Sequence, residues 1–69
     1  MNNKTDTNRT SNLTNENFIN AKGVSELMGI SVSRSYKIIQ KLNMELESNG
    51  FITISGKVSR RYFMERVAL

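Results

Sequence analysis

Three basic residues share one side of a helix predicted in the middle of this sequence of 69 residues. Arg34, Lys37 and Lys41 stand at positions i, i+3 and i+7, a spacing that brings their side chains to one face. Guanidinium and ammonium groups bind phosphate oxygens through charge and hydrogen bonds. The whole chain carries ten Lys and Arg against six Asp and Glu, which gives a net charge of +4. Both features favour a polyanionic partner, with an ordinary solvated face as the alternative.

A second basic cluster follows a predicted turn. Lys57, Arg60 and Arg61 lie within the five residues after Gly56. On a hairpin that protrudes beside a DNA-binding helix, these side chains would contact the phosphate backbone or the minor groove. Three basic residues that merely keep a small domain soluble are the alternative interpretation.

The composition argues against several classes of chemistry. The chain has no Cys and no His, which excludes disulfides, Cys/His zinc sites and catalysis by those side chains. One Asp and no paired carboxylates make an enzyme, a cofactor and a small-molecule substrate unexpected. Apolar runs of two or three residues are too short for a membrane span or a signal peptide, so we expect a cytoplasmic protein without a membrane partner.

Composition also divides the chain in two. Residues 1–17 are polar and rich in Asn and Thr, and only Met1 and Leu13 are apolar. Such a segment cannot bury enough apolar surface to offset the entropy lost on ordering, so we predict a disordered tail. Its charges cancel, and the net charge therefore belongs to residues 18–69, the predicted domain.

The domain begins with two predicted helices. Asn20 is a good N-cap for a helix over residues 21–28, and Gly29 suits the position just beyond its end. Ser31 caps a second helix over residues 32–48, which stops at Asn-Gly. The short connection with its glycine is typical of a helix-turn-helix.

The remaining elements are short. Phe18 and Ile19 form either a strand fragment or a hydrophobic lead-in. Residues 51–55 are rich in β-formers and predict one strand of a hairpin, with Gly56 as the turn and residues 57–58 as the return strand. Ser59 can cap a last helix from Arg60 to about Val67, with Phe63 and Val67 facing the core.

The second helix has a predicted core face and an unusual charge order. Its basic residues lie in the N-terminal half and its acids, Glu45 and Glu47, in the last third, opposite to the preference of the helix dipole. Local rules tend to break at functional sites, and a basic helix start suits entry into the DNA major groove. The core arc consists of Val32, Ser35, Tyr36, Ile39, Leu42 and Leu46.

Residues 28–39, MGISVSRSYKII, resemble the helix-turn-helix of small MerR-like winged-helix proteins of the excisionase family, from phages and integrative elements. Residues 42–54, LNMELESNGFITI, and 56–63, GKVSRRYF, are similar to a subgroup with a long second helix and a compact wing. Departures are Val32, at a site often polar or basic, and Gly23 and Ser25, where an acid and Ala are common.

The resemblance implies an α+β fold, a small winged helix-turn-helix whose first helices, hairpin wing and last helix follow the order above. It also implies two sets of DNA-facing residues. Those facing the major groove or its phosphates are Ser31, Ser33, Arg34, Tyr36 and Lys37, and those on the wing are Lys57, Arg60 and Arg61. The charged stripe adds Lys41 to this set of DNA-binding candidates.

Three functions remain open at this point. The first is an excisionase that binds repeats beside an attachment site as several copies and bends double-stranded DNA for an integrase. The second is a small transcriptional regulator that uses the same surface. The third is a protein-binding anti-repressor that docks through exposed Met44 and Met64.

Overall fold

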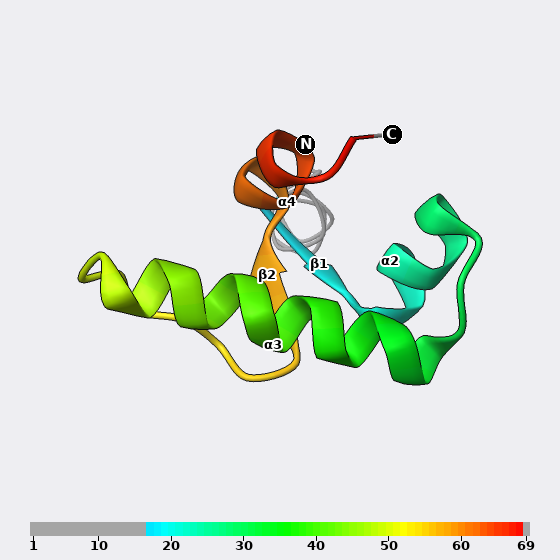
Figure 1. Ribbon diagram of the computed structural model, residues 1–69, viewed down its shortest axis with the longest axis horizontal. Helices are drawn as coiled ribbons and strands as arrows, with labels where there is room; N and C mark the ends of the chain where they lie inside the picture. Colours follow the sequence, from blue (N-terminus) through cyan, green and yellow to red (C-terminus); the bar gives the residue numbers. More distant parts are fainter. Residues whose placement is uncertain (1–16, 69) are drawn as a thin grey trace, which may run out of the picture.

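A computed structural model describes residues 17–68 of the chain as a small α+β fold. The predicted tail, residues 1–17, lies outside the described residues except for Asn17. None of the helices in the described part is long and apolar enough to cross a membrane. In chain order the elements in Figure 1 are β1 (Phe18–Asn20), α2 (Ala21–Met28), α3 (Val32–Ser48), β2 (Lys57–Ser59) and α4 (Arg60–Arg66).

Helices α2 and α3 begin and end where the local signals predict. The Asn20 side chain accepts a hydrogen bond from the Gly23 backbone N–H at 2.9 Å, and the Ser31 hydroxyl accepts one from the Arg34 N–H at 3.1 Å. Gly29 ends α2 with φ of 68°, a left-handed conformation that costs glycine little. The predicted boundaries of both helices are confirmed. Figure 1 shows α2 beside the N-terminal half of α3, with which it packs.

Both unusual residues of α2 have a packing reason. A Cβ atom at Gly23 would lie 2.8 Å from Cγ1 of the buried, branched side chain of Ile19. Glycine is therefore needed for β1 to lie against the first turn of α2. The Ser25 hydroxyl donates a hydrogen bond to the Ile30 carbonyl and so ties α2 to the turn before α3.

The sheet corrects the predicted hairpin. Strand β2 pairs antiparallel with β1, so that Ile19 lies opposite Val58. Residues 51–55 form no strand, and Ile52 is 99% exposed. The prediction was wrong because a β-rich composition does not supply a buried face, whereas Ile19 and Val58 bury their side chains together. Of the two alternatives for Phe18 and Ile19, the strand is the one observed.

Seven apolar residues from all five elements form the core. The predicted core face of α3 is correct at Ser35, Ile39 and Leu42, but Val32 and Tyr36 are 45% and 55% exposed. Within residues 17–68, Val32 and Tyr36 lie outside the core cluster, and Tyr36 instead borders an open groove. The buried apolar residues are Ile19, Ala21, Val24, Ile39, Leu42, Val58 and Phe63.

Helix α4 is attached to α3 by polar contacts as well as by Phe63. The Glu45 carboxylate accepts hydrogen bonds from Arg66 Nε at 2.9 Å, Arg66 Nη2 at 2.8 Å and the Tyr62 hydroxyl at 2.7 Å. These donors lower the pKa of Glu45 to about 2, the Arg66 hydrogen bonds first and that of Tyr62 second. Val67, expected as the last helical residue, is the half-buried C-cap of α4.

Candidate nucleic-acid interface

The basic stripe predicted from the sequence is present on the exposed side of α3. Arg34, Lys37 and Lys41 are all exposed, and none of them forms an ion pair within residues 17–68. Lys41 lies close enough to Glu45 to contribute to its lowered pKa. Because the core holds the opposite side of α3, these three cations are directed to solvent.

The N-terminus of α3 brings two further candidates beside this stripe. Ser31 and Ser33 are both exposed. The Ser31 hydroxyl caps the helix by accepting from Arg34, and the Ser31 carbonyl accepts the Ser35 hydroxyl at 2.8 Å. Ser31 therefore shapes the helix start, where free backbone N–H groups and the positive end of the dipole favour anions.

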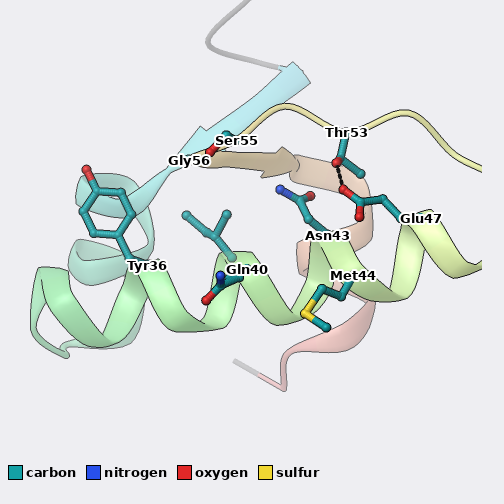
Figure 2. Close-up of a pocket in the computed structure, with 9 residues that line it drawn as sticks. Tyr36, Gln40, Asn43, Met44, Glu47, Thr53, Ser55 and Gly56 are labelled. Atoms are coloured by element: carbon teal, nitrogen blue, oxygen red, sulfur yellow. Dashed lines mark hydrogen bonds between the residues drawn. The ribbon is translucent and has the colours of Figure 1, made fainter.

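A groove of about 580 Å³ runs between α3 and the chain segment that leads into β2. As Figure 2 shows, Tyr36, Gln40 and Met44 come from α3. The opposite wall is formed by Thr53, Ser55 and Gly56. At the far end of the groove Thr53 donates a hydrogen bond to the Glu47 carboxylate. Tyr36, expected in the core arc and also among the DNA-binding residues, borders this groove.

Asn43 holds the opposite wall in place. Its Nδ2 donates to the carbonyl oxygens of Ile54 at 3.1 Å and Lys57 at 2.8 Å, while its Oδ1 is buried without a partner in the described part of the chain. Within the segment, the Lys57 N–H donates to the Ile54 carbonyl at 3.2 Å. Gly56, the third residue of this turn, has φ of 84°, which favours glycine.

Sequence reasoning missed Asn43 as a structural residue. The signal was a polar side chain four residues after Ile39, on the side of the helix that carries the core. Asn43 is 7% exposed, so its amide is one of the few polar groups in the interior. Its two hydrogen bonds position the turn that the predicted hairpin was expected to form.

The second basic cluster lies on the elements predicted for it, but not on a hairpin. Lys57 begins β2 and Arg60 and Arg61 begin α4, whereas β2 pairs with β1 and not with residues 51–55. Arg60 and Arg61 border a second groove, of about 970 Å³, that also includes Phe51 and Met64. The residues around this groove are different from those around the first one. Contact of Lys57, Arg60 and Arg61 with DNA stays a prediction.

One curated protein matches most of the chain. The ICEBs1 excisionase of Bacillus subtilis (strain 168) is 38% identical over 48 residues, which cover 70% of this chain and 75% of that protein. The chain belongs to this excisionase family. No protein-family model matches this excisionase-family chain, and no solved structure matches it. The predicted resemblance to excisionases is confirmed, whereas the MerR-like winged-helix subtype stays a prediction.

Proposed function

We propose that this chain is a DNA-binding excisionase of a mobile genetic element and that α3 enters the major groove. The basic stripe carries the proposal: Arg34 and Lys37 are exposed in the first two turns of α3, without an ion pair in residues 17–68. A stripe that served stability alone would be expected at the other end of the helix, near the negative end of the dipole. The excisionase from Bacillus subtilis supports the same function by relationship.

The arrangement of α2, a three-residue connection and α3 supports insertion as a helix-turn-helix. In that motif the second helix presents its N-terminal residues to base edges, while backbone N–H groups meet phosphates. Helix α3 has 17 residues and is therefore about 25 Å long, enough for its N-terminal half to occupy the groove while the rest supports the fold. Ser33, Arg34, Tyr36 and Lys37 would be its contacts.

The turn at residues 54–57 takes the place of the expected hairpin as the element beside α3. Asn43 holds this turn, which ends at Lys57. We assign Lys57 and Arg61 to phosphate contacts that orient the protein without specifying sequence. Lys41, farther along α3, would contact the backbone at the edge of the major groove.

In recombination, the role that fits is architectural. A domain of about fifty residues contacts few base pairs, so selectivity would come from several copies on repeated sites and from bending of the DNA. The bent complex would favour excision by an integrase. The protein itself would supply no catalytic group.

Footprinting on the attachment region of the element, with and without its integrase, tests this function. We expect protection of repeated sites by the wild type, stronger in the presence of integrase, and loss of protection in an Arg34→Ala/Lys37→Ala variant. Lys22→Ala, which removes an exposed lysine from α2, is the matched control and should bind nearly as the wild type does. Protection confined to a promoter, without effect on recombination, would favour a transcriptional regulator instead.

A further inference from the structure

One row of side chains on the exposed surface of α3 is unlike the basic stripe. Tyr36, Gln40 and Met44 are spaced by four residues, which places them in one line along the helix. Tyr36 and Met44 are 55% and 64% exposed, and Gln40 between them is exposed as well. All three border the groove in Figure 2. The row therefore offers one neutral amide between two side chains with large apolar surface.

The amide of Gln40 is available for hydrogen bonds, unlike the other polar groups beside it. Asn43 uses both amide hydrogens on the turn, and the Glu47 carboxylate accepts from Thr53. Within residues 17–68 the Gln40 side chain makes no hydrogen bond. It is thus the one amide side chain of α3 that can both donate and accept toward an outside partner.

The chemistry of this row matches one kind of base pair. A glutamine amide can donate to N7 of adenine and accept from its N6 amino group, whereas Arg and Lys pair with guanine or with phosphates. The methyl group of thymine is the apolar feature of the major groove, and Met44 and Tyr36 present apolar surface on either side of the amide. Lys37 and Lys41, on the adjacent row, would hold the flanking phosphates.

We propose that Gln40 determines sequence specificity by reading an adenine–thymine pair in the major groove, with Tyr36 against the thymine methyl group. This inference rests on the proposed function, because it requires α3 to lie in the groove. It goes beyond that function in assigning one residue to one type of base pair.

Selection from a pool of duplexes with a randomised central segment provides the first test, with wild type and Gln40→Met as the two proteins. Methionine is similar to glutamine in side-chain length and in helix propensity, but it lacks the amide group. Both proteins should enrich related sites, but the variant should lose preference at one adenine–thymine position. Lys22→Ala is the control and should enrich the wild-type site unchanged.

A base analogue gives the second test. Replacing the adenine at that position with 7-deazaadenine removes the N7 acceptor and should weaken wild-type binding about 5- to 150-fold. The same replacement should have little effect on Gln40→Met, since the hydrogen bond is already absent. Equal losses for both proteins, or an unchanged preference of Gln40→Met in the selection, would overturn the assignment.

These outcomes are separable from the proposed function. If the wild type enriches no site and shows no preference over random DNA, the proposed function fails. If the wild type enriches a site and Gln40→Met retains every base preference, DNA binding stands and Gln40 is only a solvated side chain. Circular dichroism should show the same helix content for both proteins, because Gln40 lies outside the core.

Discussion

The Glu45 carboxylate in α3 accepts hydrogen bonds from both Nε and Nη2 of Arg66 in α4, at 2.9 and 2.8 Å, although the two residues are 21 positions apart in the chain. This bidentate contact joins α3, the helix proposed to enter the major groove, to the last helix. It also accounts for an acid in the C-terminal part of α3, against the preference of the helix dipole. The contact is near the surface, because 45% of the Arg66 side chain and 27% of the Glu45 side chain are exposed. Its strength therefore depends on geometry more than on burial.

The first prediction is a loss of stability in acid that depends on Glu45. The folded state lowers the pKa of Glu45 from 4.5 to about 2, chiefly through the Arg66 hydrogen bonds. A lowered pKa stabilises the fold above about pH 4.5, and this contribution is lost as the pH falls toward 2. Thermal unfolding between pH 6 and pH 2 should therefore show a steeper drop in Tm for the wild type than for Glu45→Gln. Glu26→Gln is the control, and a wild-type curve parallel to that of Glu45→Gln would contradict the prediction.

The second prediction concerns the turn beside α3. Asn43→Ala removes the donors to Ile54 and Lys57 and leaves two carbonyl oxygens without these partners. We expect a decrease of about 1–3 kcal/mol in the free energy of unfolding, measured in urea. Amide exchange at residues 53–57 should be faster than in the wild type. The unpartnered Oδ1 is lost in the same variant, which offsets part of the decrease. Unchanged exchange in this segment would show that Asn43 does not hold the turn.

The third prediction concerns Gly23. Helix propensity alone would make Gly23→Ala stabilising by about 0.5–1 kcal/mol. The new Cβ would meet Ile19 Cγ1 at 2.8 Å, and Ile19 is branched and buried against Val58, so it cannot move away without disturbing the sheet. We therefore expect a net destabilisation of about 1–3 kcal/mol in urea unfolding. Lys22→Ala, next to it on the exposed side, should change stability by less than about 0.5 kcal/mol. A stabilised Gly23→Ala protein would mean that the strand and helix are less closely packed.

The fourth prediction separates phosphate contacts from base contacts. Lys57→Ala/Arg61→Ala should weaken binding to the cognate site and to random DNA by similar factors. Each lost phosphate contact reduces the slope of log affinity against log salt by about 0.9, so the double variant should have a slope about two units flatter. Salt titrations of binding measure this directly. Parallel lines for variant and wild type would place these residues outside the interface, and a loss confined to the cognate site would mean that they read bases.

The elements of this protein are largely determined by local sequence. Asn20, Ser31 and Ser59 each accept a hydrogen bond from the backbone N–H three residues later, and all three were recognisable as caps. Gly29 was recognisable as the end of α2, because the left-handed conformation needed there is one that glycine adopts readily. The exposed positions of Arg34, Lys37 and Lys41 follow from helical spacing once the apolar face is known.

Only the tertiary structure decided which segments meet. Strand β2 pairs with β1, nearly forty residues earlier, and not with residues 51–55, because burial of Ile19 against Val58 outweighs the local β-propensity of an uncovered segment. The exposure of Tyr36 and the burial of Asn43 likewise depend on what lies over each side of α3. A helical period states which residues share a face, but the covering elements determine where that face ends, and these come from distant parts of the chain.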